Sequence, residues 1–192
     1  MNKIIKNTII LTLITVIAGL GLGAVYEITK EPIAAAQETA KKEAWQAVFP
    51  EASLDDFETV ELDYDLMTQV VADLGIVATI DEVCKVGDLG YVVTATDKEG
   101  YGGDIQVTVG IKADGTVNGV SILSISETAG LGMKATEPAF YEQYSGKQTE
   151  QFYVSKDGGS GEPIDALSGA TITSRAVTGA VNAALSYVLN AF

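Results

Sequence analysis

Residues 8–26 contain no charged side chain and consist mainly of Ile, Leu, Val, Ala, Thr and Gly. At a rise of about 1.5 Å per residue, a helix of this length just crosses a hydrocarbon core of about 30 Å. Lys3 and Lys6 lie before the run. We therefore predict a transmembrane helix over residues 8–28, in contact with membrane lipid, and a cytoplasmic N-terminus over residues 1–7.

A cleaved signal peptide is the alternative, because it also has a basic start and an apolar stretch. The apolar run exceeds the about 7 to 15 residues typical of a signal peptide, and the small residues 34–36 lie too far beyond it for cleavage. We therefore expect a retained anchor. The positive-inside rule keeps the lysines in the cytoplasm. The chain is then a single-pass protein of the cytoplasmic membrane whose domain is extracytoplasmic.

The composition excludes several kinds of chemistry. With 192 residues, 47% of them hydrophobic, the chain is long enough for one well-cored domain plus an anchor. A net charge of −14 leaves no basic surface for a nucleic-acid partner. The sequence has no histidine and a single cysteine, Cys84, so it lacks the usual ligands of haem, zinc and iron–sulfur sites. Redox chemistry would therefore require an organic cofactor, and Cys84 is expected to be a buried packing residue.

A second helix is predicted directly after the anchor. Pro32 stands where a new helix would begin, strong helix formers follow it, and Pro50 would end it. We expect a juxtamembrane helix over residues 29–50 and then the domain over residues 51–192. Residues 54–86 mix short apolar runs with acidic side chains that lack the spacing of a calcium-binding loop, and we expect them at the edge of the domain.

Three β-rich runs follow, at residues 90–96, 104–111 and 117–124. Turn sequences separate them, and the Asp-Gly pair at 114–115 is typical of a hairpin. No helix is predicted between these strands. The sequence therefore favours an antiparallel meander in an α+β domain over a doubly wound α/β fold.

Small and hydroxyl residues at 165–174, DALSGATITS, run directly into a predicted amphipathic helix. Gly169 and Ala170 leave the backbone accessible, and the start of the helix supplies free N–H groups and the positive end of its dipole. Such a place holds a phosphate. Ser, Thr and Asp are also ordinary capping residues, so a helix cap without a ligand is the alternative.

Two loops near the predicted strands are rich in glycine, at residues 100–103 and 126–132. Together with the C-terminal motif, they are expected where backbone comes close to a flat ligand. Tyr141 and Tyr144 could shield a ring system, although a small core cluster is the favoured interpretation. Residues 155–161 have the composition of a flexible connector and lack the ending of a P-loop.

These motifs carry a resemblance to a known family. Residues 165–174 resemble the D-x-x-S/T-G-A-T-x-T/S flavinylation signal, at which a separate flavin transferase links FMN through its phosphate to the threonine of S-G-A-T. Residues 126–132, SETAGLG, resemble the flavin-facing E-T-x-G-L-G loop of the same FMN-binding domains. With the anchor leading into EITKEPI at 27–33, the sequence is similar to RnfG subunits of the Rnf membrane complex over nearly its whole length.

The resemblance implies an electron carrier rather than an independently catalytic chain. RnfG-like subunits hold covalent FMN on the outer side of the membrane, and their complex couples ferredoxin and NAD oxidoreduction to sodium or proton movement. By motif, Thr171 is the phosphoester attachment residue and Asp165 belongs to the signal that the flavin transferase recognises. The residues matching the phosphate pocket are Ser168, Gly169, Ala170 and Thr173. The residues matching the loop near the flavin are Glu127, Thr128, Leu131 and Gly132.

Two alternatives stay open. One is the related NqrC-type subunit of a sodium-pumping quinone reductase, which has the same cofactor and different partner subunits; the short chain argues against it. The other is a membrane-anchored assembly subunit without a redox role, in which the motif before the last helix is only a cap.

Overall fold

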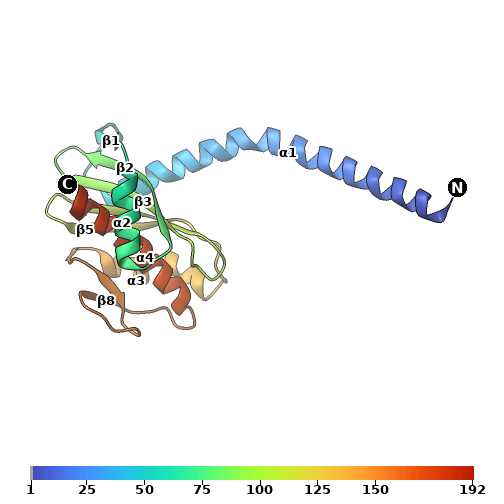
Figure 1. Cartoon of the computed structure of the whole chain (residues 1–192). Helices are drawn as coiled ribbons and strands as arrows, with labels where there is room; N and C mark the ends of the chain where they lie inside the picture. Colours follow the sequence, from blue (N-terminus) through green and yellow to red (C-terminus); the bar gives the residue numbers. More distant parts are fainter. Residues whose placement is uncertain (1) are drawn as a thin grey trace. The chain divides into compact units, whose positions relative to one another are not determined.

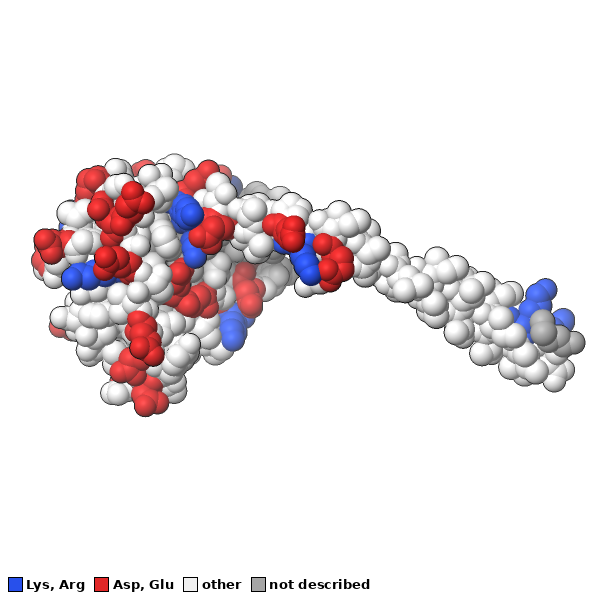
Figure 2. Space-filling model, turned by 90° about the horizontal axis from the view of Figure 1, so that it is seen from above, with Lys and Arg blue, Asp and Glu red and all other residues white. Residues whose placement is uncertain are grey.

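The computed structural model describes residues 2–192, which fall into two units, one ending at Ala40 and one from Lys41 to Phe192. The N-terminal unit consists of most of helix α1 (Lys3–Val48). Among the described helices, α1 is the one long and apolar enough to cross a membrane, and its apolar window is wholly exposed. Figure 2 shows this part of α1 as an uncharged stretch between the lysines near its start and the charged residues that follow.

The prediction of a separate helix beginning at Pro32 is wrong, because Pro32 lies inside α1. Proline removes one backbone hydrogen bond and crowds the preceding turn, which usually bends or ends a helix. Here the strong helix formers on both sides keep the helical conformation going as far as Val48. The division of this helix into membrane and juxtamembrane parts stays a prediction.

The second unit is an α+β domain, as predicted (Figure 1). Its main sheet contains β1 (Phe57–Val60), β2 (Ala78–Val86), β3 (Gly90–Asp97), β4 (Ile105–Lys112), β5 (Thr116–Ser124) and β6 (Lys147–Gln148). Its α-helices after α1 are α2 (Tyr64–Leu74), α3 (Pro138–Tyr141) and α4 (Thr171–Ala191). Short 3-10 turns are η1 (Leu54–Asp56), η2 (Gly132–Thr136) and η3 (Glu142–Tyr144). A small parallel pair is formed by β7 (Phe152–Val154) and β8 (Glu162–Ile164).

The six strands of the main sheet lie in sequence order, and every neighbouring pair is antiparallel. The three predicted strands correspond to β3, β4 and β5, so the predicted meander is confirmed. The expectation that residues 54–86 lie at the edge of the domain is wrong for β2, which pairs with β1 on one side and β3 on the other. A β-bulge between Ile80 and Glu82 places two acidic residues next to each other in β2, and this break in the alternation conceals an interior strand in the sequence.

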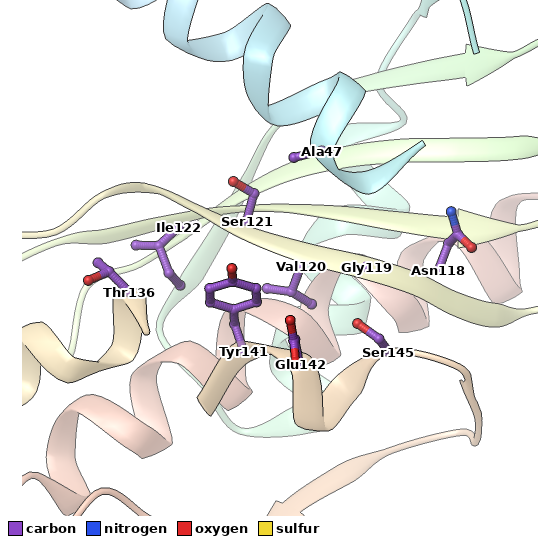
Figure 3. A pocket seen from close by; sticks show the side chains of 10 residues that line it. All are labelled: Ala47, Asn118, Gly119, Val120, Ser121, Ile122, Thr136, Tyr141, Glu142 and Ser145. Carbon is purple, nitrogen blue, oxygen red and sulfur yellow. The ribbon is translucent and has the colours of Figure 1, made fainter. Parts of the chain in front are cut away.

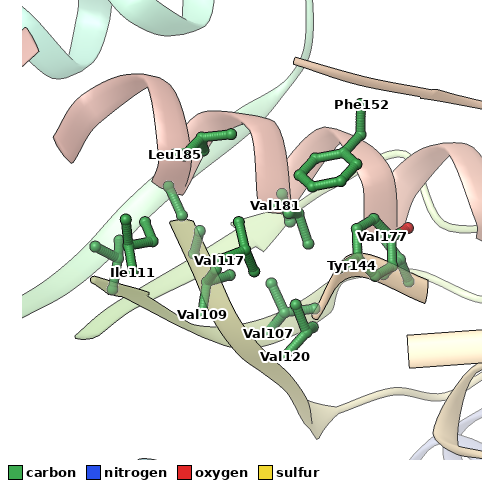
Figure 4. Packing of buried hydrophobic residues seen from close by; sticks show 14 of the residues in the cluster. Val107, Val109, Ile111, Val117, Val120, Tyr144, Phe152, Val177, Val181 and Leu185 are labelled. Atoms are coloured by element: carbon green, nitrogen blue, oxygen red, sulfur yellow. The ribbon is translucent and has the colours of Figure 1, made fainter. Parts of the chain in front are cut away.

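Helix α4 packs on one face of this sheet and forms the main core (Figure 4). Apolar side chains of β4 and β5 meet the apolar face of α4, and Phe152 and Tyr144 close the same cluster. The predicted face of the last helix, Val177, Val181, Ala184, Leu185 and Val188, is entirely buried. Tyr144 has no exposed surface, so its predicted place in the core is confirmed.

The other face of the sheet is covered by the last turns of α1. Trp45, Val48 and Phe49 pack there against Cys84 and Val92, and the prediction that Cys84 is a buried packing residue is confirmed. Burial raises the pKa of the Cys84 thiol, which keeps it in its unreactive protonated form.

Val48 packs against two glycines, Gly110 and Gly119, that are paired across β4 and β5. A Cβ atom on Gly110 would lie 2.9 Å from the Val48 Cβ and carbonyl oxygen, whereas one on Gly119 would lie 3.4 Å from the Val48 Cα. The Asn118 side chain donates a hydrogen bond to the Val48 carbonyl oxygen, which would otherwise be unpaired at the end of α1. The end of α1 is therefore fixed to the sheet by both shape and hydrogen bonding.

A buried carboxyl group lies between β3 and α4. Asp97 is 2% exposed, and a Cβ atom on Gly179 of α4 would lie only 2.5 Å from its Oδ2 atom. Its Oδ1 atom accepts a hydrogen bond from the Glu99 backbone N–H. Burial raises the pKa of Asp97 to about 6, and the charge of Glu99 adds to that shift.

Candidate functional site

The predicted phosphate-binding motif forms the N-terminus of α4, with Thr171 as the first helical residue. Ala170 occupies the N-cap position, and no side-chain hydrogen bond caps the helix there. The Ser174 hydroxyl instead closes the preceding turn, accepting from the Leu167 N–H and donating to the Ala170 carbonyl. The first N–H groups of α4 thus lack the side-chain cap that the alternative interpretation of the motif predicts. This arrangement leaves them available to an anion.

Gly169 gives the chain its turn into α4. Its φ of +77° belongs to the left-handed region, where a side chain would be strained. A Cβ atom there would also lie 3.2 Å from the Leu131 Cδ2 atom. The motif and the loop at 126–132 therefore meet directly at this position.

A second close approach joins the same loop to the first turn of α4. A Cβ atom on Gly132 would lie 2.6 Å from Thr173 Oγ1 and 2.7 Å from Glu127 Oε2. Thr173 is 1% exposed, so the hydroxyl is held inside the protein rather than at the surface. Gly132 is needed because only a bare backbone leaves room for both polar groups.

The loop at 100–103 packs on the loop at 126–132. The Gly102 backbone N–H donates a 3.1 Å hydrogen bond to Glu127 Oε1. A Cβ atom on Gly102 would lie 2.1 Å from the Ser126 carbonyl oxygen, and one on Gly100 would lie 3.0 Å from Glu127 Oε1. The Glu127 carboxylate therefore links both glycine loops.

These three segments enclose a cavity of about 590 Å³, which is within the range of small-molecule and cofactor sites. Most of its lining comes from the two glycine loops and the first turn of α4, and one residue comes from the segment at 155–161. The lining residues are Tyr101, Glu127, Thr128, Leu131, Gly132, Lys156, Gly169, Ala170, Thr171, Ile172 and Thr173.

Lys156 brings a positive charge to the start of α4. Its Nζ atom lies 3.4 Å from Thr171 Oγ1, and it is the one cation among the described residues that line the cavity. The next residue, Asp157, accepts two hydrogen bonds from the Arg175 guanidinium. This pair lowers the pKa of Asp157 and raises that of Arg175. The segment expected to be a flexible connector is thus attached to α4 next to the predicted site.

The FMN-binding domain family matches residues 100–186, which include all the residues that line this cavity. The RnfG N-terminal region matches residues 1–48. The G subunit of the Na(+)-translocating ferredoxin:NAD(+) oxidoreductase complex of Acetobacterium woodii is 32% identical, covering 97% of this chain and 92% of the relative. This chain belongs to the RnfG family.

Other relatives in the RnfG family are similar to about the same degree. The G subunit of the ion-translocating oxidoreductase complex of Methanosarcina acetivorans is 33% identical, over 97% of this chain and 95% of the relative. Its counterpart in the proton-translocating ferredoxin:NAD(+) oxidoreductase complex of Clostridium ljungdahlii is 34% identical, over 97% and 92%. A solved structure of NqrC from Shewanella oneidensis is 28% identical, with a TM-score of 0.45 over 57% of this chain and 59% of that chain.

Most of the residues predicted from the RnfG resemblance line the cavity, and two do not. Ser168 is exposed in the turn before α4, outside the lining. Asp165 lies outside it as well, with its backbone N–H donating to Gln143 Oε1 and its carboxylate accepting from the Ser155 hydroxyl. Three lining residues were not predicted: Tyr101, Lys156 and Ile172.

A second cavity of about 420 Å³ lies between β5, the α3–η3 segment and the end of α1 (Figure 3). Tyr141, Glu142 and Ser145 line one side of it, and Ser121 and Ile122 of β5 line the other. Of the described residues that line it, none is a lysine or arginine. It therefore offers no counter-charge to a phosphate, unlike the cavity at α4.

Proposed function

We propose that this protein carries FMN, covalently bound through a phosphoester to Thr171, as an electron-transfer subunit of an Rnf-type ion-translocating oxidoreductase complex. One observation carries the proposal: the Thr171 hydroxyl lies inside a cavity of cofactor size, at the uncapped N-terminus of α4 and next to Lys156. The membership of the RnfG family supports the same function, because the relatives are subunits of such complexes.

The start of α4 suits the phosphate of FMN. A phosphoester on Thr171 keeps negatively charged oxygens that require donors. The free N–H groups of the first helical turn and the Lys156 ammonium group are such donors, and the helix dipole adds a favourable field. Thr173 is buried beside Gly132 and helps to shape the floor of this pocket.

The rest of the cavity suits the flavin ring. Leu131 and Ile172 provide apolar walls, and the bare backbone of the glycine loops lets a flat ring come close. Bound FMN supplies the electron-accepting and electron-donating chemistry. The chain's own part is to hold the phosphate, to orient the ring between the loops and to exclude water from one side of it.

The sequence relatives favour an Rnf-type complex over a quinone reductase, because the three described above cover almost the whole chain and belong to ion-translocating oxidoreductase complexes. Their names include both sodium and proton translocation, so the proposal is limited to an ion-translocating complex. The expected partners are the other integral-membrane and redox subunits of that complex.

We further propose that α1 anchors the domain on the extracytoplasmic side. Lys3 and Lys6 precede the uncharged run, and the positive-inside rule keeps such a start in the cytoplasm. A flavin transferase would attach FMN to the domain, reading residues around Thr171. Asp165 is exposed and six residues before Thr171, which is consistent with contact to that enzyme during maturation.

The test compares two threonines in the first turn of α4. The chain is co-expressed with a flavin transferase and examined by intact-mass spectrometry and by fluorescence in a denaturing gel. The wild type should gain the mass of FMN less one water and fluoresce. Thr171→Ala should lose both signals, because it removes the attachment oxygen, whereas Thr173→Ala should keep them. An unmodified wild-type chain, in cells shown to flavinylate another substrate, would refute the proposal.

A further inference from the structure

Tyr101 lines the proposed flavin cavity although it is one of the most exposed large side chains of the domain. It is 72% exposed, and it is the one aromatic side chain among the described residues that line the cavity. Exposed aromatic rings at the mouth of a cavity commonly mark a surface that a ligand or partner covers. Packing within the protein therefore does not account for the position of the Tyr101 ring.

The loop that carries Tyr101 is fixed on both sides of it. A Cβ atom on Gly102 would lie 2.1 Å from the Ser126 carbonyl oxygen, and one on Gly100 would lie 2.2 Å from the Gly103 carbonyl oxygen, so neither position has room for a side chain. The Gly102 N–H is held by Glu127 Oε1 at 3.1 Å. The backbone on either side of Tyr101 is thus positioned by glycine packing and a hydrogen bond, while its side chain contributes little to holding the loop.

Two other segments that line the cavity carry apolar side chains of suitable size. Leu131 is 42% exposed and Ile172 is 45% exposed, and they come from a different loop and from the first turn of α4. Ile172 follows Thr171 directly, so a group tethered at Thr171 extends from beside one of these walls. A flat ring between Tyr101 and these two side chains would bury apolar surface on both of its faces.

We propose that the phenol ring of Tyr101 packs against the isoalloxazine ring of the FMN held at Thr171 and orients it in the cavity. This inference rests on the proposed function. Tyr101 acts as a positioning residue: the rigid loop presents its ring, and the flavin supplies the partner that the ring lacks. The predicted contact also limits the access of solvent to that face of the flavin.

Flavin emission tests this contact. An excited isoalloxazine takes one electron from a phenol or indole ring in contact with it and then returns it, so emission is lost without net chemistry. Full-length protein carrying FMN is purified in detergent, and its emission when folded is divided by its emission after unfolding in urea. We expect a low ratio for the wild type and for Tyr101→Trp, and a severalfold higher ratio for Tyr101→Leu.

The matched control is Tyr64→Leu, because Tyr64 is similarly exposed at 66% but does not line the cavity. Its emission ratio should equal that of the wild type. Full FMN by mass with an unchanged ratio in Tyr101→Leu would overturn the ring contact alone, and so would a high ratio in Tyr101→Trp. Absence of the FMN mass from the wild type would instead refute the proposed function, and the ring contact with it.

Discussion

The Nζ atom of Lys156 lies 3.4 Å from the Oγ1 atom of Thr171. The two residues belong to different segments, one preceding β8 and one starting α4. Their proximity places a positive charge where the proposed phosphoester would carry negative charge. The first prediction concerns this charge.

Lys156→Met should lower the fraction of protein that acquires FMN when the flavin transferase is limiting. An exposed charge contact contributes about 1 kcal/mol or less, so the loss should be smaller than about tenfold. Intact-mass spectrometry over a time course measures the fraction. Lys112→Met is the control, because Lys112 is exposed and does not line the cavity. Equal rates for the wild type and Lys156→Met would contradict the role given to this lysine.

Arg175→Gln should loosen the segment that carries Lys156. The guanidinium group donates two hydrogen bonds to Asp157, and removing them leaves residues 155–161 with less support. Hydrogen–deuterium exchange followed by mass spectrometry should show faster exchange in that peptide and unchanged exchange in β4.

The Arg175–Asp157 pair should also depend on pH. Because Arg175 lowers the pKa of Asp157, the pair persists above the usual titration range of aspartate, near pH 4, and weakens as the pH falls below that range. Unchanged exchange would show that the backbone alone fixes the segment.

Asp97→Asn should change how stability depends on pH. Burial raises the pKa of Asp97 from 3.8 to about 6, so its stabilising contribution is present below the lower value and lost as the pH rises through the higher one. A shift of this size corresponds to about 3 kcal/mol. We compare the free energies of unfolding by denaturant at pH 4 and pH 7. Relative to the wild type, Asp97→Asn should be more stable at pH 7 than at pH 4, by up to that amount.

Asp88→Asn provides the comparison for this experiment, because Asp88 is exposed in the turn between β2 and β3. It removes one acidic group from the same domain without touching a buried site. If both variants changed the free energy of unfolding equally at the two pH values, the buried carboxyl would not be the cause.

Gly110→Ala should destabilise the domain, whereas Gly119→Ala should not. The two glycines are paired across β4 and β5, but an added Cβ atom would meet Val48 at 2.9 Å from Gly110 and at 3.4 Å from Gly119. The closer approach forces the end of α1 to move, at a cost of about 1 to 3 kcal/mol. Denaturant unfolding of both variants measures this difference. Similar stabilities of the two variants would mean that Val48 does not pack closely on Gly110.

Much of the fold could be predicted from local sequence patterns. Strands β3 to β5 have β-branched residues bounded by turn sequences, and α4 has a continuous apolar face. Strand β2 is hard to predict because its bulge brings Asp81 and Glu82 together and interrupts the pattern of a strand. The helix boundary predicted at Pro32 is wrong, because the residues around Pro32 favour helix strongly enough for α1 to continue through the proline.

The sequence predicts those parts of the site in which glycines let two segments of backbone come close together. The loops at 100–103 and 126–132 and the turn at Gly169 do meet around one cavity. Lys156 could not be predicted, because its position depends on the Arg175–Asp157 pair, which joins residues 18 apart in sequence. Nothing in the composition of a Gly- and Ser-rich segment indicates that its one lysine will face a threonine on a later helix.

The segments that line the cavity are spread over residues 101 to 173, and no single hairpin or helix contains enough of them to form it. The cavity therefore exists only when α4 is docked on the sheet and both glycine loops are in place. A chain in which this docking is lost has no slot for a ring, because the lining residues no longer lie together. A flavin shielded from solvent would therefore indicate that the whole domain has folded. A flavin open to solvent would indicate a destabilised chain.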